Sequence, residues 1–187
     1  MYEVGQLKKG MKVQIDGEPY LITDYEFAKP GKGQAIYRMR MKNLITGSNL
    51  DRSYRSGDKF DAADTVSKAM EFLYVDGHHF CFMDPDTFEN YLAEDEVMGD
   101  KKYYLMPNMK VDVLLFGERI IDVQLPPFVV LKIVQSDPGV RGDTATNVTK
   151  PAKLENGLEV QVPLFINEGE WIKVDTRTSE YVERVKR

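Results

Sequence analysis

Three short turn signals, each lying between segments of alternating apolar and polar residues, constrain the fold of this chain more than any other feature. They are Asp16-Gly17, Asp76-Gly77 and Asn156-Gly157. Residues of these types tolerate the positive φ angles of tight hairpin turns, and a period of two is typical of β-strands. The sequence therefore predicts a β-hairpin in each third of the chain.

The same alternation predicts strands on both sides of these turns and elsewhere. The hairpin strands are expected at residues 11–15 and 20–25, 73–75 and 78–83, and 153–154 and 158–162. Further strands are expected at residues 110–116, 120–125, 129–134, 171–174 and 181–185. Only residues 87–104 have a helix-like composition, which Gly99 should interrupt, so one or two short helical turns are predicted there.

Short strands at this spacing predict an all-β protein made of three small β-barrels. A unit of about 60 residues has the size of an SH3-like or OB-type barrel. We expect the boundaries near Asp64-Thr65 and near Pro126-Pro127, where two prolines would stiffen a linker. The predicted domains are residues 1–64, 65–127 and 128–187.

Several classes of function find no support in the sequence. It contains no nucleophile motif, no phosphate-binding glycine loop and no cysteine pair at metal spacing. We therefore expect no catalytic residue, no metal and no cofactor. Neither a signal peptide nor a run of about 18 apolar residues is evident, so we expect a cytoplasmic protein without a membrane partner.

The single cysteine, Cys81, excludes an internal disulfide and fits a reducing compartment. A reactive pair with His78 is conceivable, but no basic group that would activate the thiol is evident. Alternation places Cys81 inside a strand, so a buried and inert thiol is expected instead.

Charge is distributed unevenly along the chain. Residues 1–64 carry 11 Lys and Arg against 9 Asp and Glu, residues 65–128 carry 5 against 12, and residues 129–187 carry 9 of each. No acid lies between Glu26 and Asp51, yet five basic residues do: Lys29, Lys32, Arg38, Arg40 and Lys42. This basic stretch predicts a contact with RNA phosphates, although a solvated strand face beside a loop would look the same.

The centre of the basic stretch, Lys29-Pro30-Gly31-Lys32-Gly33-Gln34-Ala35, is predicted to form a narrow hairpin tip. Proline fixes its own φ and favours an extended Lys29, while the two glycines leave the backbone beside Lys32 without side chains. One long cation at the apex could enter a crevice and bind RNA phosphates. From the residues alone, a hairpin tip with incidental lysines remains the alternative.

The tip resembles the loop of the bacterial elongation factor P family, in which the lysine at the position of Lys32 is extended after translation. A second segment is similar to the C-terminal signature of that family. It contains Lys150-Pro151-Ala152, Gly157, Val160-Gln161-Val162-Pro163, Ile166, Gly169-Glu170 and Ile172-Lys173-Val174-Asp175-Thr176. Phe82-Met83-Asp84-Pro85 and residues 137–144 resemble the second and third domains, so the resemblance covers essentially the whole chain.

The resemblance implies an L-shaped protein with the outline of a transfer RNA: an N-terminal SH3-like (KOW) domain and two OB-type domains. It implies a translation elongation factor, expected to be a monomer, that contacts ribosomal RNA, a ribosomal protein and peptidyl-tRNA. Such a factor stimulates peptide-bond formation at consecutive prolines. Lys32 would be its positioning arm, extended by an enzyme related to lysyl-tRNA synthetase. The loop expected to contact tRNA comprises Lys29, Pro30, Gly31, Lys32, Gly33 and Gln34.

The resemblance also implies a second contact, with messenger RNA in the exit site. The loop expected to make it comprises Arg141, Gly142, Asp143 and Thr144. A simple Asp-Thr turn between strands is the alternative, and Ala145-Thr146-Asn147-Val148-Thr149 follows where some relatives have more glycine. The acidic second domain is expected to imitate a nucleic acid in front of a cationic ribosomal protein.

Two other functions remain open at the level of the sequence. One is a general single-stranded RNA-binding protein built from OB domains, with Tyr25, Phe27 and Tyr37 as stacking residues. An acidic second unit and a neutral third unit argue against it, because only one unit could form a cationic groove. The other is a diverged elongation factor P paralogue that acts on different stalling sequences.

Overall fold

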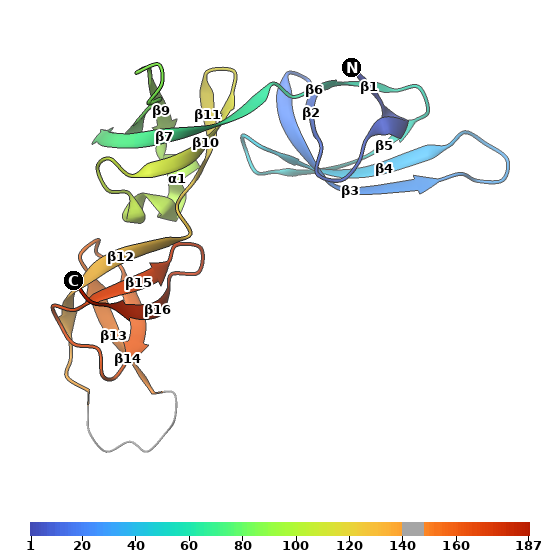
Figure 1. Cartoon of the computed structure of the whole chain (residues 1–187). Coiled ribbons are helices and arrows are strands. Elements are labelled where there is room, and N and C mark those ends of the chain that lie inside the picture. The colour runs from blue at the N-terminus through green and yellow to red at the C-terminus, as the bar shows by residue number, and fades with distance from the viewer. Residues whose placement is uncertain (140–147) are drawn as a thin grey trace.

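The computed structural model describes residues 1–139 and 148–187, and nearly all of its regular structure is β-strand (Figure 1). Within these residues the strands form three antiparallel sheets, each drawn from one continuous part of the sequence. The prediction of an all-β chain with three β-sheet domains is therefore confirmed. No helix in the described part of the chain is long and apolar enough to cross a membrane.

The N-terminal sheet has six strands in the order β1-β6-β2-β3-β4-β5. They are β1 (Tyr2–Glu3), β2 (Lys12–Ile15), β3 (Glu18–Ala28), β4 (Ile36–Asn43), β5 (Asn49–Arg55) and β6 (Lys59–Ala62), with a 3-10 turn η1 (Val4–Gln6) after β1. The sheet encloses a small apolar core of Val4, Leu7, Val13, Ile22, Met39, Met41 and Phe60.

The central sheet has five strands in the order β11-β10-β7-β8-β9. They are β7 (Thr65–Asp76), β8 (His79–Met83), β9 (Asn90–Glu94), β10 (Lys110–Phe116) and β11 (Arg119–Gln124). Between β9 and β10 lie a single helical turn, α1 (Asp95–Met98), and the 3-10 segment η2 (Gly99–Tyr104). Met98 and Tyr104 from these turns are buried in the core of this sheet.

The C-terminal sheet also has five strands, in the order β14-β13-β12-β15-β16. They are β12 (Phe128–Ser136), β13 (Thr149–Leu154), β14 (Glu159–Pro163), β15 (Trp171–Asp175) and β16 (Glu180–Val185). In Figure 1 the C-terminal sheet lies below the central one, while the N-terminal sheet extends to the side, so the three form an L.

All three predicted hairpins are present. At the first, Asp16 and Gly17 have φ of 52° and 81°, as a tight turn between β2 and β3 requires. At the second, Asp76 pairs with His79, so the turn consists of Gly77 and His78 and lies one residue later than predicted.

The short helical turns predicted within residues 87–104 are present as α1 and η2, whereas β9 in the same segment and strands β1, β4, β5 and β6 were not predicted. Residues 90–94 form β9, because pairing with β8 outweighs the helix preference of Leu92, Ala93 and Glu94. Gly99, with φ of 50°, does separate the two helical segments. The missed strands β4, β5 and β6 carry many polar residues, and β4 was treated only as a possible strand face.

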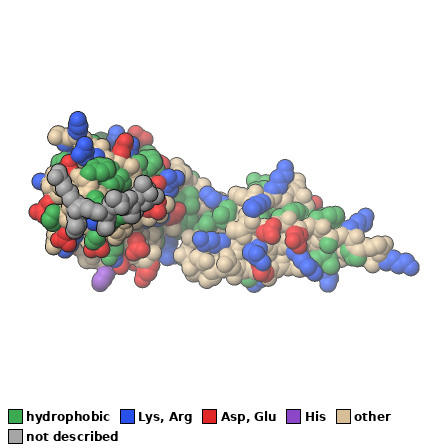
Figure 2. Space-filling view, turned by 90° about the horizontal axis from the view of Figure 1, so that it is seen from below, with side chains coloured by type: hydrophobic (Ala, Val, Ile, Leu, Met, Phe, Trp, Pro, Cys, Tyr) green, Lys and Arg blue, Asp and Glu red, His purple; other side chains and the backbone are tan. Residues whose placement is uncertain are grey.

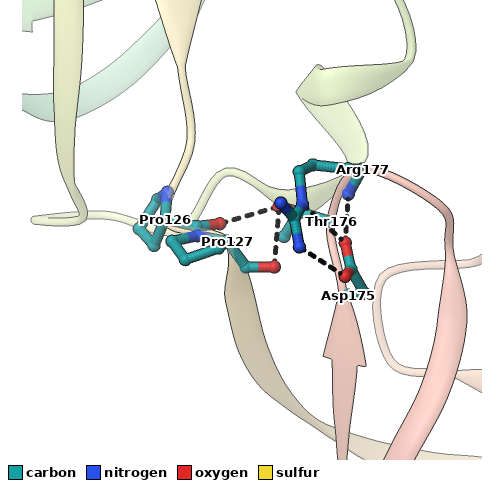
Figure 3. A network of polar contacts seen from close by, with 5 residues as sticks. All are labelled: Pro126, Pro127, Asp175, Thr176 and Arg177. Carbon is teal, nitrogen blue, oxygen red and sulfur yellow. Dashed lines mark hydrogen bonds and ion pairs between the residues drawn. The ribbon is translucent and has the colours of Figure 1, made fainter.

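The central and C-terminal sheets are joined by apolar packing and by hydrogen bonds. Their buried side chains form one continuous cluster. Thr176 Oγ1 donates to the carbonyl oxygen of Pro126 at 2.7 Å and lies 3.2 Å from that of Pro127, next to the ion pair of Arg177 with Asp175 (Figure 3). The core of the N-terminal sheet is a separate cluster, so the N-terminal domain has a hydrophobic core of its own.

Candidate functional site

The site predicted from the sequence lies at the end of an arm built from β3, β4 and β5. Strands β3 and β4 pair as far as Ala28 and Ile36, and β5 pairs with β4 as far as Arg55 opposite Ile36. The arm extends away from the rest of the N-terminal sheet, toward the right in Figure 1. Residues 29–35 close the hairpin at its outer end.

The predicted tip is exposed throughout residues 29–34. Gly33 has φ of 152°, which a residue with a β-carbon rarely adopts, and a β-carbon on Gly31 would meet no atom within 4 Å. Within residues 1–139 and 148–187, neither Lys29 nor Lys32 forms an ion pair. Figure 2 shows Lys and Arg side chains at the outer end of the arm, so this charge can meet a partner.

Two of the cations further back on the arm lie near acids that are distant in the sequence, and one of them forms an ion pair. Arg40 Nε lies 3.1 Å from Asp51 Oδ1, and Arg38 stands opposite Glu26 in the β3–β4 ladder. A shallow hollow of about 300 Å³ on this face is lined by both signs of charge, from Asp24, Glu26, Arg38, Arg40, Asp51 and Arg52. Residues 29–35, in contrast, hold two lysines and no acid, so nearby carboxylates offset the positive charge along the strands and not within the tip.

The second predicted loop, comprising Arg141, Gly142, Asp143 and Thr144, lies outside the described residues. The residues at its base are described. Lys150 is buried, and its Nζ donates to the carbonyl oxygen of Asp137 at 2.6 Å. A β-carbon on Gly139 would lie 2.7 Å from the carbonyl oxygen of Leu164, so only glycine fits there. Lys150 belongs to the C-terminal signature, but no sequence pattern indicated the Gly139 contact.

In the acidic central domain, one carboxylate is buried and organises a turn. Asp84 accepts a hydrogen bond from the Asp86 N–H at 2.9 Å and pairs with the Lys68 ammonium at 3.2 Å. These contacts hold the pKa of the Asp84 carboxyl below its usual value, against the opposing effect of burial. Asp84 therefore fixes the turn between β8 and β9 and is not free to contact a partner.

Cys81 lies in β8 with 1% of its surface exposed and forms no disulfide. The prediction of a buried thiol is thus confirmed. In the described part of the chain, no three His, Cys, Asp or Glu side chains are grouped as metal ligands would be.

Three family models together match most of the chain. The model described as "Elongation factor P (EF-P) KOW-like domain" matches residues 3–60, and the "Elongation factor P (EF-P) OB domain" matches residues 65–123. The model "Elongation factor P, C-terminal" matches residues 129–184. Each model covers one of the three sheets, and the first contains the arm and its tip.

Relatives of known name match over their full length. Elongation factor P 2 of Geobacter sulfurreducens is 52% identical over 186 residues, which is 100% of each chain. Elongation factor P of Desulforapulum autotrophicum is 51% identical over 186 residues, 99% of each chain. Among solved structures, eukaryotic translation initiation factor 5A from Methanococcus jannaschii superposes with a TM-score of 0.54 at 23% identity, covering 67% of this chain and 90% of that one. That last similarity concerns the fold alone.

Proposed function

Because this chain belongs to the elongation factor P family, we propose that it acts beside peptidyl-tRNA on the ribosome and speeds peptide-bond formation between consecutive prolines. Its family and fold make it a translation elongation factor that works with the ribosome. In this proposal, the tip at residues 29–34 positions the end of the tRNA.

The observation that carries this proposal is the state of Lys32. Its side chain is exposed at the far end of the arm, between two glycines, and it forms no ion pair with any described residue. A cation presented in this way keeps its charge available for RNA phosphates. The arm also gives it reach, because seven residues of β4, Ile36 to Lys42, pair with both neighbouring strands behind it.

The proposed mechanism is orientation, without acid–base chemistry by the protein. Proline is a poor nucleophile and a stiff residue in the nascent chain, so a misplaced peptidyl-tRNA reacts slowly. Holding the reacting groups in a productive geometry removes part of the entropic barrier, and such effects reach several kcal/mol. The tip contributes two cations, with Lys32 at its apex, and a narrow backbone, which suits holding a tRNA end in place.

We propose that Lys32 is extended after translation by an enzyme related to lysyl-tRNA synthetase. The exposure of the lysine and the bare glycine backbone on both sides support this, since the enzyme must reach the Nζ atom. An added β-lysyl group would lengthen the side chain and supply further hydrogen-bond donors to RNA.

Two further contacts belong to the same proposal. The loop with Arg141, Gly142, Asp143 and Thr144 would approach messenger RNA in the exit site, and Lys150 and Gly139 would hold its base. The central domain, with 12 acids against 5 basic residues, would face a cationic ribosomal protein. Reversing the charge of several exposed acids there should weaken ribosome binding, and unchanged binding would refute this contact.

The proposal is tested by the yield of a reporter with three consecutive prolines in a reconstituted translation system. We expect protein purified from its native source to raise the full-length yield and the Lys32→Ala variant to fail. Lys42→Ala is the matched control, because it removes an exposed lysine of the same domain that lies outside the tip. A reporter without prolines should respond to none of the three proteins. Equal stimulation by the native and Lys32→Ala proteins would overturn the proposal.

A further inference from the structure

A strip of aromatic side chains runs along the core-facing side of the arm. Phe27 pairs with Tyr37 across β3 and β4, and Tyr37 pairs with Tyr54 across β4 and β5. The rings of Phe27 and Tyr37 have centroids 5.0 Å apart at 50°. At the inner end Tyr54 contacts Phe60, with centroids 4.8 Å apart and the rings nearly perpendicular. The strip thus leads from the buried core outward to Phe27.

The inner and middle parts of this strip are covered, whereas its outer end is open. The hydroxyl of Tyr25 donates to the carbonyl oxygen of Val4 at 3.1 Å, and a β-carbon on Gly5 would lie 3.2 Å from the Tyr37 hydroxyl oxygen. The turn η1 therefore packs over these two tyrosines. Phe27, the next aromatic residue outward, keeps 55% of its surface exposed.

The open ring of Phe27 lies in electrostatic surroundings that suit RNA. Side chains alternate between the two sides of a strand, so Glu26 and Arg38 point to the face opposite Phe27. Phe27 is two residues from Lys29 and five from Lys32, and neither lysine forms an ion pair with any residue that the structure describes. Figure 2 shows hydrophobic surface among the Lys and Arg side chains along this arm. An exposed aromatic ring beside cations is the combination that binds single-stranded nucleic acid by base stacking.

We propose that Phe27 is a positioning residue whose open ring stacks on an unpaired base at the acceptor end of peptidyl-tRNA. This inference rests on the proposed function, in which Lys32 meets the same tRNA end. Stacking would fix the depth at which the tip enters, so that the Lys32 side chain reaches the reacting end in one orientation. The strip behind Phe27 holds the ring in place, because Tyr37 contacts it and itself packs against the core.

The first test compares Phe27→Leu, Phe27→Trp and the control Phe88→Leu in the rate of Pro–Pro bond formation on stalled ribosomes. Phe88 is 74% exposed in the central domain, so the control removes an exposed ring elsewhere. We expect Phe27→Leu to lower the rate about tenfold at saturating factor, a size consistent with the loss of one stacked base. Phe27→Trp should retain the native rate, and Phe88→Leu should change nothing. A native rate for Phe27→Leu, or equal losses for Leu and Trp, would overturn the inference.

The second test identifies the base by photo-crosslinking, with p-benzoylphenylalanine in place of Phe27 or, as control, of Phe88. We expect the probe at position 27 to crosslink to the acceptor end of peptidyl-tRNA. Crosslinks from that position only to ribosomal RNA, only to ribosomal protein, or to no partner would refute the assignment. The Lys32→Ala variant separates the two proposals: if it loses activity while Phe27→Leu does not, only the role of Phe27 fails.

Discussion

The hydroxyl of Tyr104 lies 2.6 Å from the hydroxyl of Ser179, so a residue of the central domain is hydrogen-bonded directly to one of the C-terminal domain. Tyr104 is otherwise buried in the apolar cluster that the two domains share. Ser179 has φ of 59°, an unfavourable angle for a residue with a β-carbon, which the turn between β15 and β16 imposes.

Removing this hydrogen bond should weaken the junction between the two domains. We expect Tyr104→Phe to lower the free energy of unfolding by about 1 kcal/mol, the usual net contribution of one such bond. Ser179→Gly also removes a hydroxyl but relieves the strained φ, so it should cost less than Ser179→Ala. Urea denaturation followed by tryptophan fluorescence measures all three, since Trp171 lies in the C-terminal sheet. Equal stability of the Gly and Ala variants would contradict the argument from φ.

The contact of Gly139 with Leu164 predicts that the base of the 140–147 loop does not tolerate a side chain. A β-carbon at this position would lie 2.7 Å from a backbone oxygen, so the chain must shift. We expect Gly139→Ala to cost about 1–3 kcal/mol of stability, as overpacking usually does. Gly31→Ala is the control, because its β-carbon would meet nothing within 4 Å. A stability loss equal in both variants would show that the Leu164 contact is not the cause.

The lowered pKa of Asp84 predicts part of the acid sensitivity of the central domain. The Asp86 N–H and the Lys68 ammonium favour its ionised form in the folded protein, so its folded pKa lies below the unfolded value of about 3.9. The resulting stability is present at pH values above the unfolded pKa and is lost as the pH falls through the folded one.

Asp84→Asn should therefore lower stability near neutral pH and flatten its decline below about pH 4. The urea midpoint, measured from acid to neutral pH for both proteins, gives the two curves. Asp175, whose pKa is lowered by the Arg177 side chain, contributes equally to both and is a common background. Parallel curves for native and variant protein would contradict the role of Asp84.

The burial of Cys81 predicts that its thiol reacts only when the central domain opens. With 1% of its surface exposed, it should react with a disulfide reagent far more slowly in the native protein than in denaturant. Prompt reaction of the native protein would show that β8 is more open than described.

Much of the fold could be predicted from local patterns. The hairpin turns and most strands of the central and C-terminal sheets follow from alternation and turn residues, because these signals act over a few positions. Strands β5 and β9 could not be predicted in this way. Residues 49–55 are largely polar, and residues 90–94 favour helix, so only pairing with β4 and β8 makes them strands.

The candidate site, too, could be predicted only in part from the sequence. The exposed tip with Lys32 is a local feature, and its proline and glycines predict it. The neutralisation of Arg40 depends on Asp51, and the covering of Tyr37 depends on Gly5. Such contacts join residues that are distant in the sequence, so the structure was needed to find that Arg40 is ion-paired and that the open ring is that of Phe27.

The central claim is tested most directly by the single-turnover rate of bond formation between a prolyl donor and a prolyl acceptor on the ribosome. The rate is measured without factor, with protein from the native source, and with Lys32→Ala. We predict acceleration by the native protein and a rate at least about tenfold lower with the variant, equivalent to about 1.4 kcal/mol of barrier. Both proteins should bind the ribosome and unfold at the same urea concentration. Equal rates for the native and variant proteins would contradict the account.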